Sequence, residues 1–106
     1  MIAVLFEVEL HDCHKQRYLD LAAELRPSLE RIPGFISIER FQSLANNDRL
    51  LSLSFWQSEQ AVLEWKRFEA HQQAQQEGRA RLFKDYRISI AQIVRSYDMA
   101  SSKAEA

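Results

Sequence analysis

Residues 2–10, IAVLFEVEL, alternate between two kinds of side chain with a period of two, which is the pattern of a β-strand. One face of this segment is wholly apolar and consists of Ile2, Val4, Phe6, Val8 and Leu10. The opposite face is mixed, because Glu7 and Glu9 follow two apolar residues on it. A strand with one fully apolar face must bury that face, so the chain is predicted to fold around a sheet that is covered on one side.

Three later segments repeat the alternation and predict three more strands. Residues 36–43 set Ile36, Ile38, Arg40 and Gln42 against Ser37, Glu39, Phe41 and Ser43. Residues 49–56 set Leu51, Leu53 and Phe55 against Ser52, Ser54 and Trp56. Residues 85–97 set the row Tyr86, Ile88, Ile90, Gln92 and Val94 against a second row that ends at Tyr97. The turn sequence LANND joins the second and third segments and predicts an antiparallel hairpin.

Two segments between the strands have the rhythm of amphipathic helices instead. In the first, apolar residues recur at spacings of three and four: Tyr18, Leu21, Leu25, Leu29 and Ile32. Asp12 is placed to cap this helix, and Pro27 predicts a kink or a break within it. In the second, Ser58 is the expected N-cap of a helix that extends to Phe83, and an interruption of that helix is expected near Phe68.

The order of elements, βαββαβ, predicts the ferredoxin-like α+β fold, a four-stranded antiparallel sheet with both helices on one face. At 106 residues the chain is one domain, which we expect to span residues 1–98 and to be followed by a flexible polar tail at residues 99–106. The second face of the sheet also carries alternating apolar side chains. Such a face is too apolar for open solvent, so we expect a homodimer that packs the two open sheet faces together.

Composition limits the partners and the cellular location that we expect for the protein. The 14 basic and 15 acidic residues leave a formal net charge of −1, which argues against nucleic acid or an anionic membrane as the main partner. No apolar run approaches the roughly 20 residues of a membrane-spanning helix, and the first residues do not form a basic leader. Cys13 is the only cysteine, which favours a reducing, cytoplasmic location.

Metal and nucleotide sites are not expected from the sequence. The spacing of His11, Asp12, Cys13 and His14 fits no zinc pattern. With two glycines in all, the chain has no glycine-rich loop for phosphate groups.

A polar row on the second predicted helix is the main candidate for catalysis. His71, Gln75 and Arg79 follow one another at intervals of four, so they lie on one side of the helix at the border of its apolar face. A histidine titrates near neutral pH and can accept or donate a proton, and an arginine can hold a carboxylate, a phenolate or a developing oxyanion. Two alternatives are that the row only makes hydrogen bonds at the helix rim, or that His71 ligates heme.

Four aromatic residues are candidates for the wall of a pocket that accepts a flat molecule: Trp56, Trp65, Phe68 and Tyr86. The alternative is that the tryptophans pack the core and that Tyr86 closes the sheet, as large aromatics on apolar faces commonly do. Glu7 and Glu9 share one face of the first strand, where they are candidates for a polar cleft or for a solvated or dimer-paired role.

Three stretches, IPGFISIERFQS, RLLSLSFWQSEQAVLEW and EAHQQAQQEGRARLFKDYRISIAQIVRSY, together with the βαββαβ order, resemble the antibiotic biosynthesis monooxygenase domains of the dimeric α+β barrel superfamily. The likeness covers about residues 2–97. It implies a homodimer with a small-molecule pocket in each subunit between the helices and the sheet. Members of this family include cofactor-independent oxygenases of anthrones, quinol oxygenases and heme-degrading monooxygenases.

The sequence departs from the heme-degrading members, which carry an asparagine on the first strand and a heme-ligand histidine farther beyond the helix tryptophan than His71 lies beyond Trp65. Residues 2–10 contain no asparagine, and Gln75 stands at the place of that histidine. Anthrone oxygenases also use a pocket asparagine, whereas Asn46 and Asn47 of this chain belong to the predicted hairpin turn.

The resemblance thus implies a monooxygenase without cofactor that acts on a small aromatic or quinol-type substrate. In this hypothesis His71 moves a proton, Arg79 holds negative charge, and Gln75 and Tyr86 join the tryptophans and Phe68 around the substrate. The alternatives are a dimer that binds heme or another small molecule without turnover, and a structural dimer with a vestigial pocket.

Overall fold

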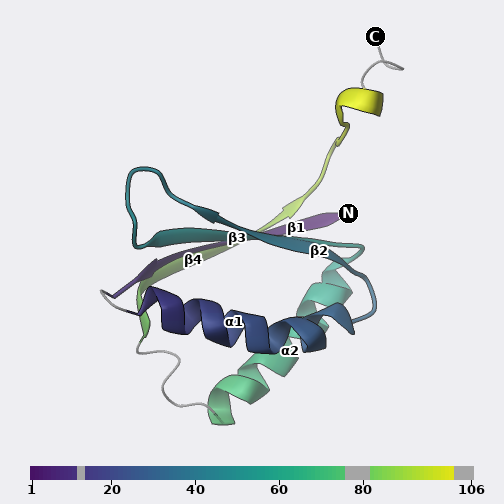
Figure 1. Ribbon diagram of the computed structural model, residues 1–106. Helices are drawn as coiled ribbons and strands as arrows, with labels where there is room; N and C mark the ends of the chain where they lie inside the picture. The colour runs from purple at the N-terminus through teal and green to yellow at the C-terminus, as the bar shows by residue number, and fades with distance from the viewer. Residues whose placement is uncertain (12–13, 76–81, 102–106) are drawn as a thin grey trace.

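A computed structural model describes residues 1–11, 14–75 and 82–101 of the chain. The elements follow in the order β1 (Ile2–Leu10), α1 (Lys15–Glu30), β2 (Phe35–Gln42), β3 (Arg49–Trp56), α2 (Glu59–Gln75) and β4 (Phe83–Gln92). The four strands form one antiparallel sheet in the order β2-β3-β1-β4, and both helices lie on the same side of it (Figure 1). The predicted ferredoxin-like fold is therefore confirmed.

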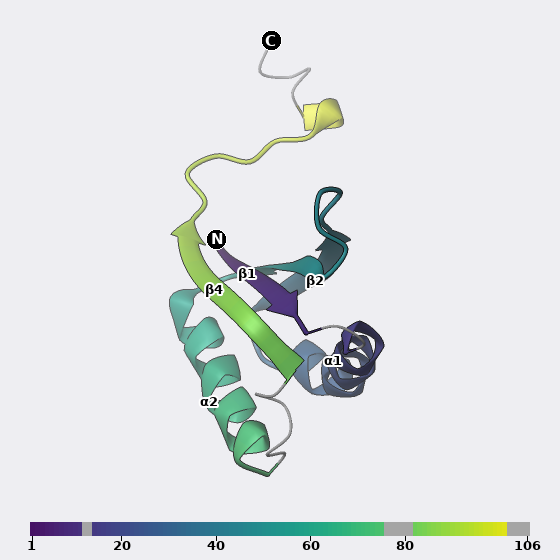
Figure 2. The same cartoon turned by 90° about the vertical axis from the view of Figure 1, so that its left-hand side faces the viewer.

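The register of the sheet decides which residues face the helices. On β1 the wholly apolar row faces them, because Val8 and Leu10 pack with α1 and Ile2 packs with α2. Two apolar clusters result. The first consists of Val8, Leu10, Tyr18, Leu21, Leu50 and Leu82, and the second of Ile2, Leu29, Trp56, Ala61 and Val62. Figure 2 shows the two helices side by side along the sheet; α1 contributes to both clusters, whereas α2 contributes to the second.

Strand β3 faces the helices with its serines. Ser54 lies opposite Val4 and Ser52 lies opposite Phe6, so both serines share the helix-facing side with Trp56. Both serines are buried, whereas Leu51 and Leu53 on the open face of the sheet are only partly covered. The alternation of residues 49–56 predicted the two faces correctly but did not show that the serine face is the buried one.

Gly34 sets the path from α1 into β2. Its φ of +95° lies in the left-handed region, which favours glycine. A Cβ at this position would lie 2.8 Å from the Cβ of Ala61 on α2, so the glycine also allows β2 to begin close to that helix. The register of β2 shifts between Phe35 and Ser37, and Phe35 packs on Trp56 in the second cluster. Ile36, which the alternation placed in one row with Ile38, is exposed because of this shift, whereas Ile38 packs against the second cluster.

Helix α1 differs from the sequence prediction at two places. Its N-cap is His14, which makes no side-chain capping bond, rather than Asp12, which lies outside the described residues. Pro27 lies inside the helix, and α1 continues to Glu30 without a break. The last turn is held by backbone bonds from Arg31 and by Leu29, which is buried in the second cluster. Packing of this turn thus offsets the hydrogen bond that a proline cannot make.

The second half of the chain also corrects the predicted boundaries. Ser58 caps α2 as expected, because its Oγ accepts a hydrogen bond from the Ala61 N–H at 3.3 Å. Helix α2 passes Phe68 without interruption, and Phe83 begins β4 rather than ending a helix. Strand β4 ends at Gln92, so Tyr97 lies beyond the sheet. None of the described helices combines the length and the apolar character needed to cross a membrane.

Candidate functional site

A polar layer separates the two apolar clusters on the helix-facing side of the sheet. We use this name for the hydroxyl group of Tyr18, whose ring belongs to the first cluster, and for Arg40 of β2 and Ser52 and Ser54 of β3. In the sheet register Arg40 lies opposite Ser52, and Ser52 in turn lies opposite Phe6. Polar groups in such a place require hydrogen-bond partners, since burial removes them from water.

Two weak or moderate bonds hold the hydroxyl groups of the layer. The indole N–H of Trp56 donates to Ser54 Oγ over 2.9 Å. The Tyr18 and Ser52 hydroxyl oxygens are 3.4 Å apart, and either group can be the donor. Ser54 therefore acts as an acceptor, and its own proton is directed to no acceptor on the described residues. The layer thus combines one arginine with three hydroxyl groups and contains no carboxylate.

Arg40 is the unsatisfied member of the layer. Its Nε atom is buried and has no hydrogen-bond partner, and neither of the ion pairs in the described part of the chain includes Arg40. Gln42, the next residue in the same row, also has an unpartnered oxygen, Oε1. Its Nε2 is committed to the hairpin, where it donates to the carbonyl oxygens of Ser43, Asn46 and Arg49.

Aromatic side chains flank the helix-facing side at both edges. Trp65 and Phe68 of α2 stack with ring centroids 5.4 Å apart, and Trp65 packs against the second cluster. At the other end, Tyr86 meets Phe6 edge to face at 5.9 Å. The helix-side row of β4 remains about half exposed, with values of 58% for Tyr86, 50% for Ile88 and 47% for Ile90. The helices thus leave apolar surface open along β4.

The structure locates some of the predicted site residues and leaves others undescribed. Trp56 belongs to the core, where only 1% of it is exposed, and Trp65, Phe68 and Tyr86 lie on the helix-facing side. The backbones of His71 and Gln75 belong to α2, but their side chains lie outside the described part. Arg79 lies outside the described residues altogether.

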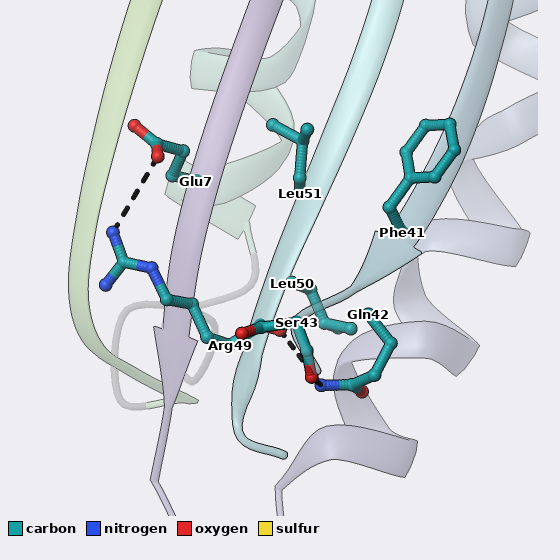
Figure 3. A pocket seen from close by; sticks show the side chains of 7 residues that line it. All are labelled: Glu7, Phe41, Gln42, Ser43, Arg49, Leu50 and Leu51. Carbon is teal, nitrogen blue, oxygen red and sulfur yellow. Dashed lines mark hydrogen bonds and ion pairs between the residues drawn. The ribbon is translucent and has the colours of Figure 1, made fainter. Parts of the chain in front are cut away.

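A pocket of about 280 Å³ lies elsewhere, on the open face of the sheet near the β2–β3 hairpin. Figure 3 shows its lining, which consists of Glu7, Phe41, Gln42, Ser43, Arg49, Leu50 and Leu51. Glu7 and Arg49 form an ion pair at 3.8 Å across it, and Asn46 donates to the carboxylate of Glu9 at 2.8 Å. Glu7, a candidate for a polar cleft, lines this pocket, whereas none of the residues predicted for catalysis or for the substrate pocket does. The two glutamates thus have partners within the sheet and its hairpin.

Two further observations concern the rest of the described chain. No group of three histidine, cysteine or acidic residues that could hold a metal ion occurs among residues 1–11, 14–75 and 82–101. Beyond β4, hydrogen bonds from the backbone and the hydroxyl of Ser101 lower the pKa of the exposed Asp98 carboxyl. That turn is remote in sequence from the polar layer and stabilises only the end of the chain.

Sequence reasoning missed the polar layer as a candidate site. A signal was present, because Arg40 interrupts an apolar row and two serines share a face with a tryptophan. The alternation could not show that this face is buried, since the opposite face of β3 is more apolar.

Comparison with known proteins identifies the family to which this chain belongs. The sequence profile of the antibiotic biosynthesis monooxygenase family matches residues 1–77. The chain belongs to the antibiotic biosynthesis monooxygenase family. It is also 38% identical over 96 residues to the "Jasmonate monooxygenase ABM" of Pyricularia oryzae. That match covers 91% of this chain but 45% of the relative, and the chain spans less than two thirds of each curated relative it matches.

Solved structures with this family's fold are similar at low sequence identity. A conserved protein from Methanosarcina mazei Go1 has a TM-score of 0.73 and 21% identity, and the match covers 86% of this chain and 90% of that one. The MhuD R26S mutant, solved with two manganese protoporphyrin IX molecules per active site, has a TM-score of 0.69 and 14% identity over 92% of this chain and 99% of that one. These likenesses establish the fold alone.

Proposed function

We propose that the chain is a monooxygenase that acts on a small aromatic or quinol-type substrate without a bound cofactor. Membership of the antibiotic biosynthesis monooxygenase family carries this proposal. The helix-facing side of the sheet supports it, because that side offers flat aromatic surfaces beside buried hydrogen-bond donors. A flat substrate with one or more phenolic oxygens matches both kinds of surface.

The chemistry uses the electrons of the substrate to reduce oxygen. For an anthrone, a base removes a proton from the methylene carbon between the rings, and the carbanion is electron-rich enough to react with O₂. One oxygen atom becomes the new carbonyl oxygen and the other leaves as water, so a CH₂ group and O₂ give C=O and H₂O. His71 would accept or relay the proton, and Arg79 would stabilise the negative charge.

The remaining predicted residues would form the surroundings of the substrate. Trp65 and Phe68 supply a stacked aromatic surface on α2, and Tyr86 supplies a hydroxyl group at the exposed edge of the sheet. Trp56 is buried and would not contact the substrate, but its indole N–H donates a hydrogen bond to Ser54 and so fixes that hydroxyl group. Gln75 lies one turn beyond His71 on the helix and would supply an amide to the same space.

We further propose that two copies pack through the open sheet face. Apolar residues of β1 and β3 line the centre of that face: Ala3, Leu5, Leu51, Leu53 and Phe55. After β4 the chain rises on this same side, away from the helices (Figure 1), and Val94 is 93% exposed there. A second copy would cover the central row and give the extended segment a surface to lie on.

Oxygen uptake tests the activity. Purified protein is mixed with an anthrone or a quinol in an oxygen-electrode cell, with buffer alone as the control for spontaneous oxidation. We expect uptake that depends on protein, one O₂ consumed per product, and a rate about 10²-fold or more lower for His71→Ala if the histidine moves the proton. An unchanged rate in the variant would remove His71 from the mechanism.

The same sample distinguishes the competing function. If no substrate supports uptake, while heme titration gives a shifted Soret band that His71→Ala abolishes, the protein is a heme-binding dimer instead. If neither occurs, the space beside the polar layer is vestigial.

A further inference from the structure

The buried, unpartnered Nε of Arg40, a residue that is itself only partly buried, requires an explanation. Arginine is always charged in proteins, and burying any part of that charge without a partner is costly. The residue lies on an edge strand, between Ile38 and Gln42 in the inward row. An apolar residue there could be buried at a lower cost in free energy. Such a buried donor needs an acceptor from outside the described residues, and the acceptor group of a bound ligand is one that fits an arginine.

The neighbours of Arg40 are neutral hydroxyl groups, which can donate as well as accept, and none of them is an anion. Ser52, its cross-strand neighbour, shares one contact with the Tyr18 hydroxyl, which leaves one of the two protons without an acceptor. The hydroxyl oxygen of Ser54 already accepts from Trp56, so its proton is also free for another group. No carboxylate from the described residues is hydrogen-bonded or ion-paired to any of these groups.

Apolar side chains continue the row of Arg40 and Ser52 across the sheet. The sheet register leads from Arg40 and Ser52 to Phe6 and then to Ile88, which is half exposed on the helix-facing side of β4. A small molecule with a flat apolar body along this row would place one end at Arg40. The planar fork of an arginine is well suited to an oxygen anion at that end.

We propose that Arg40, with Ser52 and Tyr18, binds an anionic oxygen, either a carboxylate or a phenolate, on an otherwise apolar substrate. This assignment rests on the proposed function, because it takes the helix-facing side of the sheet to be the substrate site. It goes beyond that function by naming the charge of the substrate and the residues that select it. Arg40 is a binding residue here and takes no part in proton transfer.

Matched probes test the selectivity without any turnover. Isothermal titration calorimetry compares 2-naphthoate with 2-naphthalenemethanol, which has the same rings but no charge, and with 2-naphthol above and below its own pKa. The wild type is expected to bind the carboxylate, the phenolate or both about tenfold or more tightly than the neutral forms. Arg40→Gln should reduce that ratio to about one and leave binding of the neutral alcohol unchanged. Arg40→Lys should keep part of it.

The control is Arg26→Gln, which removes an exposed arginine of α1 that pairs with Glu30. It should retain the full preference, which would separate a local effect of Arg40 from a general loss of positive charge. Circular dichroism checks that each variant folds. If Arg40→Gln does not fold, Arg40→Lys and Ser52→Ala decide the matter, and both should lower the ratio.

Equal affinity for charged and neutral probes, no binding of the anions, or a preference that survives Arg40→Gln would each overturn the proposal. The outcome is independent of the oxygen experiment. A preference for anions without oxygen uptake would leave the subsite intact and contradict the monooxygenase. Oxygen uptake without a preference for anions would support the monooxygenase and contradict the subsite.

Discussion

At the scale of single residues, Arg40 is the clearest departure from a packing-optimised core. The other polar groups of the layer have hydrogen-bond partners, since Ser54 accepts from the Trp56 indole and Ser52 contacts the Tyr18 hydroxyl. Arg40 Nε has none. Proteins commonly keep such destabilising groups where function needs them, and removing them then stabilises the fold.

Replacement of Arg40 by methionine should therefore raise the melting temperature of the protein without ligand. Methionine keeps most of the packing of the arginine stem, while the unpartnered charge is lost. A gain of about 1 kcal/mol would correspond to a rise of roughly 4–8 °C in a domain of this size. Thermal unfolding followed by circular dichroism measures it. A fall in melting temperature would mean that the guanidinium is already well solvated or paired.

At the scale of elements, Gly34 ties α1, β2 and α2 together. It ends the turn after α1, starts β2 in an unusual conformation and leaves room for Ala61 of α2. Its carbonyl oxygen also accepts a hydrogen bond from the Gln57 N–H at 2.7 Å, which fixes the start of α2 relative to β2. This junction positions the second cluster beside the polar layer.

Gly34→Ala should destabilise the protein by about 2 kcal/mol or more, because an alanine pays the left-handed penalty and its Cβ meets Ala61. Urea unfolding measures the change. Pro33→Ala, at the exposed neighbouring position, is the control and should change stability by less than about 1 kcal/mol. Equal effects of the two substitutions would show that the junction is more adaptable than its geometry indicates.

The elements also show where the sequence suffices. Alternation and helical spacing predicted all six elements and their order, because each has an apolar face that must be buried. The boundaries were wrong where packing prevailed over local signals, as in the last turn of α1 at Pro27 and at Phe83, which joins the sheet. The polar layer was missed because both faces of β3 carry large side chains, and only the register shows that Ser52 and Ser54 face inward.

At the scale of the whole molecule, the proposed dimer accounts for the apolar open face. Leu53→Glu would place a charge at the centre of that face, and we expect it to convert a dimer into monomers at low micromolar concentration. Leu63→Glu is the matched control, since Leu63 is a 49% exposed leucine of α2. Analytical ultracentrifugation of the wild type and both variants distinguishes dimer from monomer. A wild-type monomer, or a Leu53 variant that remains dimeric, would contradict the proposed interface.

The central claim is that the protein places one atom of molecular oxygen into its substrate, and isotope labelling tests it most directly. An anthrone is incubated with the protein under ¹⁸O₂ in ordinary water, with buffer alone run in parallel, and the product is analysed by mass spectrometry. The account predicts that product formed at the protein-dependent rate carries one ¹⁸O atom in its new carbonyl group. Unlabelled product, or labelled product formed no faster than in buffer, would contradict it.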